Sequence, residues 1–535
     1  MKNEKFDIEI LDTTLRDGAQ GEGIVFSMRD KIAVTETLDE LGVSWIEAGN
    51  PGSNPKDLEF FRQAACLQLK NAKLCAFGST RKKNIKAEDD TQLQSIIDAG
   101  TEGVVIFGKS WKLHVNEVLQ VTPEENLAMI ADTVAFLKSK GLAVIYDAEH
   151  FFDGWAADSA FALSTVKTAV SAGADRVVLC DTNGGTFPDR IACAVKEVVK
   201  TFPNTIFGIH AHNDCGLALA NTISAVQAGC THVQGTLAGF GERCGNTALA
   251  SLIPSLELKM SLRCLPQGSL VRIGELTRRV AEIANIIISD DMPYIGDHAF
   301  AHKAGMHTDG ILKTRLSFEH IDPSAVGNER HLLMSEVGGR SAISERVKRI
   351  KPDIHKDHPV IISLAEKLKK LEAEGWAYEG ADASFEILIR RELGLYSPFF
   401  KIEAYRVMSE HPTGAIACSQ AWVKVQVGDT SEVAAAEGVG PVGALDSALR
   451  RALTHFYPNL SKVRLEDYKV RVIDGKDATS AQVRVLIEST DGQRNWNTVG
   501  VSADIIDASR AALVDSIEYM LINSEQSADN NQDFL

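Results

Sequence analysis

The sequence predicts an α/β protein whose N-terminal part is a (β/α)8 TIM barrel. Between residues 8 and 285, short apolar runs alternate with helical stretches and recur about every 25–40 residues, the rhythm of that fold. Polar residues follow most of these runs, at the strand ends where barrels carry their chemistry. The eight runs predicted as strands are 8–11, 45–48, 74–77, 103–107, 142–146, 176–180, 206–209 and 231–234.

Amphipathic stretches fill the intervals between these runs, for example 28–41, 124–140 and 161–172. A doubly wound open sheet has the same alternation, so periodicity alone leaves that alternative open. The placement of polar residues at the strand ends favours the barrel. Glycines that end the predicted helices stand just before the next strand: Gly42, Gly100, Gly141, Gly173 and Gly229.

Two further regions follow the barrel, which is assigned to residues 1–285. Residues 286–410 are charged and helix-rich, with 356–374 as the clearest helix, and are predicted to form linker subdomains. In residues 411–522, a pattern of strands followed by a helix occurs twice, which predicts a small α+β domain with an internal duplication. Residues 523–535 are polar and are predicted to be a disordered tail.

The bulk composition argues against several classes of protein. The net charge of −16 disfavours general nucleic-acid binding, which needs a basic face. No apolar run approaches the roughly 18–20 residues that span a bilayer, and the N-terminus lacks a signal peptide's features, so a cytoplasmic location without membrane contact is expected. The nine cysteines are dispersed without a Cys-x-x-Cys pair, which is typical of a reducing compartment.

His210 and His212 are the strongest indication of a metal site. They stand two apart on a predicted strand, so their side chains share one face. Two imidazoles so placed can chelate one ion, and a carboxylate from another strand can complete the ligand set. A lone histidine would more often be a hydrogen-bonded core residue, but the His-x-His pattern at a barrel strand end favours metal binding.

Arg16 stands beside Asp17, directly after the first predicted strand. An arginine inside a barrel must be paired or must face a ligand. One interpretation is a salt bridge with Asp17 or Glu149; the other is a donor aimed at an oxygen that becomes negative during a reaction. Glu149 is also a candidate general acid or base, and Asp147 lies on the same strand face.

Three motifs resemble signatures of the 2-isopropylmalate, homocitrate and citramalate synthase family. They are residues 12–18 (DTTLRDG), 210–216 (HAHNDCG) and 239–246 (GFGERCGN). Residues 299–307 and 321–323 resemble the family's linker, and the third region resembles its amino-acid-sensing domain. Residues 77–81 and 146–154 look most like a citramalate synthase branch, whose keto acid is pyruvate.

The resemblance implies a divalent ion, Mn, Mg or Zn, that holds a small 2-keto acid by its oxygen atoms. Asp17, His210, His212 and Asn246 are the residues that the family pattern places around it, and the donor types suit all three metals. Asp147 and Thr182 are implied to contact the keto acid, together with Arg16. Many isopropylmalate and homocitrate synthases carry serine at the Asp147 position, so this departure weighs against the isopropylmalate branch.

The resemblance also implies the catalytic groups. Arg16 is the expected donor to the alkoxide that forms from the keto acid. His307, from the linker, is the expected base for the methyl group of acetyl-CoA, with assistance from Glu149; His302 is its competitor. Because His307 lies outside the barrel and linkers of the family cross between subunits, a homodimer with composite sites is expected.

The third region is expected to bind an inhibitory amino acid: isoleucine if the product is citramalate, leucine if it is isopropylmalate. Gly438, Gly440 and Gly443 surround Pro441 and prepare a helix N-terminus that suits a carboxylate. A plain helix start with proline in the first turn explains each glycine equally well.

Three rival functions remain open from the sequence. One is 2-isopropylmalate synthase, which uses 2-ketoisovalerate. It stays open because a difference of one or two methylenes between two keto acids changes the discrimination between them by only about 1–3 kcal/mol. Another is a metal-dependent carbon–carbon lyase on the same barrel, a group that lacks the C-terminal part. The last is a sensor with a vestigial barrel, which the complete set of polar residues at the strand ends disfavours.

Overall fold

The computed structural model describes residues 6–302, 307, 310–311, 313–314, 317–332, 339–410, 418–473 and 481–532. The chain divides into two compact units. The first comprises Met1–Phe300 with Ile321–Arg330, and the second comprises Ala301–His320 with His331–Leu535. Among the described residues, no helix is both long enough and apolar enough to span a membrane.

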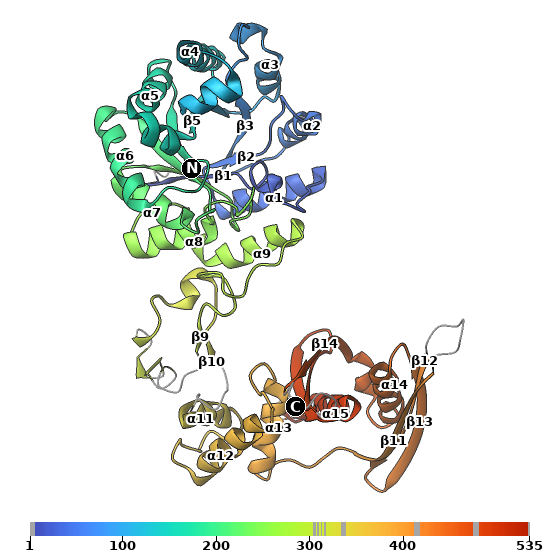
Figure 1. Cartoon of the computed structure of the whole chain (residues 1–535). Coiled ribbons are helices and arrows are strands. Elements are labelled where there is room, and N and C mark those ends of the chain that lie inside the picture. The colour runs from blue at the N-terminus through green and yellow to red at the C-terminus, as the bar shows by residue number, and fades with distance from the viewer. Residues whose placement is uncertain are drawn as a thin grey trace. The chain divides into compact units, whose positions relative to one another are not determined.

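Eight parallel strands of the first unit form a closed barrel (Figure 1). Each strand pairs with the next along the chain, and β8 pairs with β1 to close the ring. The predicted barrel is therefore confirmed, and the open sheet is excluded because it would leave two unpaired edges. The strands are β1 (Glu9–Asp12), β2 (Trp45–Glu47), β3 (Lys73–Ser79), β4 (Gly103–Lys109), β5 (Ala143–Glu149), β6 (Arg176–Asp181), β7 (Ile206–Ala211) and β8 (His232–Gly235).

Helices surround the barrel, and local sequence signals set their ends. Ser27 and Asp30 form a capping box at the start of α1, and prolines stand in the first turns of α2, α4 and α6. The five glycines predicted to end helices all have positive φ. The helices are α1 (Met28–Leu41), α2 (Pro55–Ala64), α3 (Thr91–Asp98), α4 (Pro123–Ser139), α5 (Phe151–Ser171), α6 (Pro188–Thr201), α7 (Ala218–Ala228), α8 (Leu249–Pro254) and α9 (Ile273–Ile283).

The interior of the barrel is a packed apolar layer. Its buried members point inward from the strands: Leu11, Trp45, Cys75, Val105, Ile145, Val178 and Cys180. Because strand side chains alternate, the residues two positions later along each strand also point inward, nearer the carboxyl ends. Those positions include Glu47, Phe77, Phe107 and Asp147, which form the layer above the apolar one.

The second unit contains two three-stranded antiparallel sheets, each followed by a helix. The predicted internal duplication is therefore confirmed. The first repeat is β11 (Lys401–Glu410), β12 (Cys418–Val427), β13 (Thr430–Gly438) and α14 (Pro441–Leu453); the second is β14 (Arg464–Val472), β15 (Val483–Thr490), β16 (Asn495–Ser502) and α15 (Ile505–Gln532). Before them come β9 (Ala301–His302), β10 (His331–Leu332), α11 (Gly339–Ile350), α12 (Pro359–Ala373) and α13 (Asp382–Glu392).

Two predicted boundaries in this unit need correction. β11 lies before residue 411, yet it pairs along its length with β12, so the duplicated region starts earlier than predicted. Its residues are mostly exposed, and its apolar residues are interspersed with charged ones, so this edge strand has only a weak apolar signal. α15 extends to Gln532 and so covers most of the predicted disordered tail; Asn523 continues it by donating a hydrogen bond to the carbonyl oxygen of Tyr519. Residues 533–535 lie outside the described residues.

Candidate metal centre

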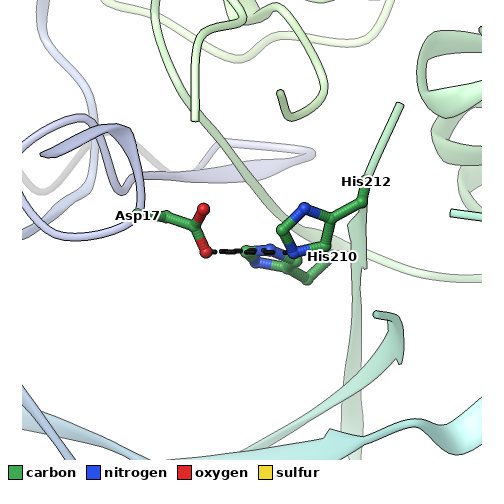
Figure 2. A group of neighbouring side chains, drawn as sticks. All are labelled: Asp17, His210 and His212. Atoms are coloured by element: carbon green, nitrogen blue, oxygen red, sulfur yellow. Dashed lines mark ion pairs between the residues drawn. The ribbon is translucent and has the colours of Figure 1, made fainter. Parts of the chain in front are cut away.

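Asp17, His210 and His212 converge at the carboxyl end of the barrel (Figure 2). Asp17 follows β1, His210 is near the end of β7, and His212 comes just after β7. The Nε2 atoms of His210 and His212 lie 3.6 and 3.9 Å from the same Asp17 oxygen, Oδ2. These distances are too long for hydrogen bonds, but ligands about 2.0–2.2 Å from a shared ion stand about this far apart.

The second oxygen of Asp17 is fixed by Asn246, whose Nδ2 donates to Oδ1 at 2.8 Å. Asn246 reaches this position because it forms an isolated bridge with His212 after β8. The approach requires Gly241, since a Cβ there would stand 2.2 Å from Asn246 Nδ2. Burial raises the pKa of Asp17, but the charges of Arg16 and the two histidines outweigh it and lower the pKa below its usual range.

Two buried polar atoms beside this cluster have no hydrogen-bond partner among the described residues. They are Nδ1 of His212 and Oδ1 of Asn246. Burial, and then the neighbouring His210, lowers the pKa of His212 to about 4, so its imidazole is neutral at neutral pH and keeps a lone pair. Asp17, His210 and His212 together offer one carboxylate and two imidazoles, a donor set that suits a divalent cation. The residues present therefore fit a divalent metal.

Arg16 is largely buried and is held on several sides. Its Nε donates to Glu47 at 2.6 Å, its Nη1 donates to Asp17 at 2.9 Å, and its guanidinium lies 3.9 Å from the centre of the Phe77 ring. The expected alternative partner, Glu149, is not among its partners. Glu47 is the second salt-bridge partner of Arg16. It was not identified from the sequence, although its position at the end of the second predicted strand could have indicated it.

Glu149 forms an ion pair with Lys109, at the end of the neighbouring strand β4. Of the two carboxylates predicted as salt-bridge partners of Arg16, Asp17 is confirmed and Glu149 is not, because β4 and β5 are adjacent and align Lys109 with Glu149. Glu149 still lines the cavity beside the metal ligands, where a general acid or base has to lie.

Thr182 has its hydroxyl oriented by the backbone. The N–H of His150 donates to Thr182 Oγ1 at 2.9 Å, so the hydroxyl hydrogen remains available to another acceptor. His150 makes this contact with a φ of 56°, a left-handed conformation that is uncommon for a residue other than glycine. Strain of this kind is often found at functional sites.

These side chains enclose a cavity of about 200 Å³. Pockets for drug-sized ligands are typically about 300–1,000 Å³, so this cavity suits a smaller molecule. Phe77 and Phe107 stack on each other and supply apolar wall. The lining residues are Arg16, Asp17, Gln20, Phe77, Phe107, Asp147, Glu149, Cys180, Thr182, His210, His212 and Glu242.

The two predicted base candidates lie outside the barrel unit. His307 is exposed and stacks on Phe318 with ring centres 4.1 Å apart. His302 is buried and contacts Glu319 at 3.3 Å, which gives it a structural explanation. Residues 303–306 of the linker motif lie outside the described residues.

The three predicted regulatory glycines lie at the start of α14. Gly440 is its N-cap residue, and Pro441 occupies the first turn. A Cβ on Gly438 would stand 2.4 Å from the backbone nitrogen of Ala444, whereas Gly440 and Gly443 have open space around them. Close packing therefore explains Gly438 without a ligand.

Three family models match the chain in succession: HMGL-like at residues 7–280, homocitrate synthase post-HMGL domain-like at 294–375, and LeuA allosteric (dimerisation) domain at 379–521. An (R)-citramalate synthase from Aquifex aeolicus is 49% identical over 97% of this chain and 98% of that protein. The chain belongs to the (R)-citramalate synthase family. Another (R)-citramalate synthase, from Synechocystis sp., is 46% identical over 97% of both chains.

A 2-isopropylmalate synthase from Methanocaldococcus jannaschii is more distant from this citramalate synthase family member. It is 30% identical over 97% of this chain and 96% of that protein. The comparison therefore favours the citramalate synthase branch over the isopropylmalate branch.

The metal site predicts a ligand-dependent gain in stability. Addition of Mn, Zn or Mg ions to metal-free protein should raise its melting temperature, since a ligand at 100 times its Kd stabilises by about 2.7 kcal/mol. Asp17→Asn and His210→Ala should remove this shift in differential scanning fluorimetry. His298→Ala, which removes an exposed histidine of the same unit, is the control and should retain it. An equal shift in all four proteins would contradict the assignment.

Proposed function

We propose that the chain joins acetyl-CoA to pyruvate and then hydrolyses the thioester, which releases (R)-citramalate and CoA for isoleucine biosynthesis. The full-length likeness to (R)-citramalate synthases carries this proposal. The small cavity at the carboxyl end of the barrel supports it, because it combines metal-ligating, cationic and acidic side chains.

Asp17, His210 and His212 would hold the divalent ion, with Asn246 alongside. Such an ion, when bound, supplies a Lewis acid for the keto group and a template for the keto acid's oxygen atoms. The chain's own contribution is a set of donors that is already in place. Asn246 holds Oδ1 of Asp17 and Arg16 holds Oδ2, so little rearrangement is needed on binding.

The condensation starts with loss of a proton from the methyl group of acetyl-CoA. His307 is our candidate for the base, and Glu149 assists from the cavity wall. The resulting carbanion forms a carbon–carbon bond to the keto carbon of pyruvate, and the keto oxygen takes the negative charge and then a proton, which makes it the hydroxyl group of citramalate. Water then cleaves the thioester, and CoA leaves as the thiol.

Arg16 is suited to stabilise the oxygen that becomes negative. Its Nε and Nη1 are engaged by Glu47 and Asp17, and Phe77 supports the flat face of its guanidinium. A donor fixed in this way pays no reorganisation cost when charge develops. Thr182, whose oxygen already accepts from His150, has its hydroxyl hydrogen available for the keto-acid carboxylate.

The other candidate functions have weaker support. The lyase alternative lacks a counterpart to residues 379–521, which match a LeuA allosteric (dimerisation) domain. The isopropylmalate alternative needs space for a branched side chain, whereas Phe77, Phe107 and the 200 Å³ cavity favour a small acceptor. A vestigial barrel would not explain the intact cluster of ligands.

The chain regions divide this work among them. We infer that residues 1–285 are catalytic, that 286–400 link the parts, and that the duplicated region, which begins with β11, senses an amino acid. A homodimer follows from the dimerisation model at 379–521 and from the location of His307 in the second unit. Each catalytic barrel is then completed by the linker of the partner subunit.

The choice of keto acid can be tested directly. Incubation with acetyl-CoA and, in turn, pyruvate, 2-ketoisovalerate and 2-ketoglutarate should release CoA thiol fastest with pyruvate. We expect kcat/KM for pyruvate to exceed that for 2-ketoisovalerate by at least tenfold, because two extra methyl groups must fit against the apolar wall that Phe77 and Phe107 form. A preference for 2-ketoisovalerate would overturn the assignment.

Composite sites predict complementation between two inactive variants. Heterodimers of His307→Ala and His210→Ala subunits, purified through two different tags, should recover about half of the wild-type activity, since one of two sites regains all its groups. Heterodimers of His210→Ala with Asp17→Asn subunits are the control and should stay inactive, because both changes lie in the barrel. No recovery in the first pair would refute the shared site.

Feedback inhibition tests the sensing region. Isoleucine should inhibit the enzyme, and leucine at the same concentration should have a smaller effect, because the end product of the proposed pathway is the expected signal. Initial rates with saturating pyruvate and acetyl-CoA provide the measurement. Rates that respond to neither amino acid would contradict a sensing role.

A further inference from the structure

A buried chain of hydrogen bonds runs from Asp147 through Gln234 to His210. Gln234 Nε2 donates to Asp147 Oδ1 at 2.9 Å, and Gln234 Oε1 lies 2.8 Å from His210 Nδ1. Gln234 is fully buried, and Asp147 and His210 are each 4% exposed. The three residues come from β8, β5 and β7, so the chain crosses the interior of the barrel.

The direction of these two hydrogen bonds sets the tautomer of His210, that is, which ring nitrogen of the neutral imidazole carries the hydrogen. A glutamine side chain has a donor end and an acceptor end, and Asp147 takes the donor. The acceptor end therefore faces His210, so Nδ1 must carry the hydrogen. His210 then keeps its lone pair on Nε2, the atom that lies 3.6 Å from Asp17 Oδ2. A neutral imidazole can bind a cation only through such a lone pair.

The second histidine lacks an equivalent support, since His212 Nδ1 has no hydrogen-bond partner among the described residues. His210 is thus the ligand whose ring orientation and tautomer the barrel sets before any ion arrives. Partners of this kind beside a metal-binding histidine commonly matter about 10- to 100-fold for metal affinity.

We propose that Gln234 is a positioning residue that prepares His210 for the metal, and that Asp147 acts through Gln234. This inference rests on the proposed metal site. It adds a role for Asp147 that differs from contact with the keto acid. If Asp147 served only as cavity wall, its replacement would change the KM for pyruvate and leave metal affinity unchanged.

Metal affinity of the metal-stripped, full-length protein, measured by competition with a chromogenic chelator, tests the proposal. Gln234→Met keeps the length of the side chain without either polar end and should weaken binding about 10- to 100-fold. Gln234→Glu keeps an acceptor for His210 Nδ1 but loses the donor to Asp147, so its affinity should lie between those of wild type and Gln234→Met. Binding by Gln234→Met within twofold of wild type would overturn the proposal.

A double-mutant cycle tests whether Asp147 acts through Gln234. Asp147→Leu should weaken metal binding, and Asp147→Leu combined with Gln234→Met should bind no more weakly than Gln234→Met alone, because coupled residues are not additive. If the double variant lost metal affinity by the product of the two single losses, Asp147 and Gln234 would have independent roles, and this part of the proposal would be overturned.

Controls separate this inference from a general loss of structure. Asn221→Leu removes another buried amide, which bonds to Asp181 and Thr186 and to none of the three ligands, and should leave metal affinity unchanged. If Gln234→Met does not fold, the metal affinities of Asp147→Leu and Asp147→Asn provide the test. Only the asparagine has an oxygen that can still accept from Gln234, so it should bind metal more tightly than the leucine variant. Equal metal affinities of these two variants would overturn the proposal. Absence of binding by the wild type would instead refute the proposed metal site.

Discussion

Closure of the barrel is the constraint on which the rest of the site depends. Pairing of β1 with β8 places the segment after β1 beside the loop after β8, although more than 200 residues separate them in sequence. Asp17 and Asn246 meet only because of that pairing, and their hydrogen bond holds the carboxylate in front of His210 and His212. An open sheet would leave these groups at opposite edges.

Inside the closed ring, the residues that face the cavity are held by residues beneath or beside it. Glu47 fixes Arg16, Gln234 fixes His210, and the backbone of His150 fixes Thr182. The supporting groups come from strands other than those of the groups they fix, or from the turn that follows a different strand. Such support from neighbouring strands explains how a site made of strand ends can be rigid enough for chemistry that needs placement within fractions of an ångström.

Much of this arrangement was predictable from the sequence because its signals are local. Apolar runs and their spacing predicted all eight strands, and the His-x-His pattern predicted that His210 and His212 share a face. Contacts that depend on neighbouring strands were not predictable in the same way. The sequence suggested Asp17 or Glu149 as the partner of Arg16. Arg16 does pair with Asp17, whereas the register between β4 and β5 pairs Glu149 with Lys109. Glu47 and Gln234 were missed because each is a single polar residue at the end of an apolar run. β11 was missed because an exposed edge strand has little apolar pattern.

The charges around the cavity explain why the site suits a divalent cation. Asp17, Glu47 and Asp147 are buried close to a single guanidinium, that of Arg16, while Glu149 already has Lys109. Burial, and then the charge of Glu47, raises the pKa of Asp147 well above its usual range, which means that a third buried negative charge is unfavourable there. An ion with two positive charges would compensate the excess of carboxylates, and imidazole ligands such as His210 and His212 add no negative charge when they bind it. The same excess of carboxylates repels an anionic ligand. A keto acid therefore binds more favourably together with a cation, because the cation neutralises the charge around it.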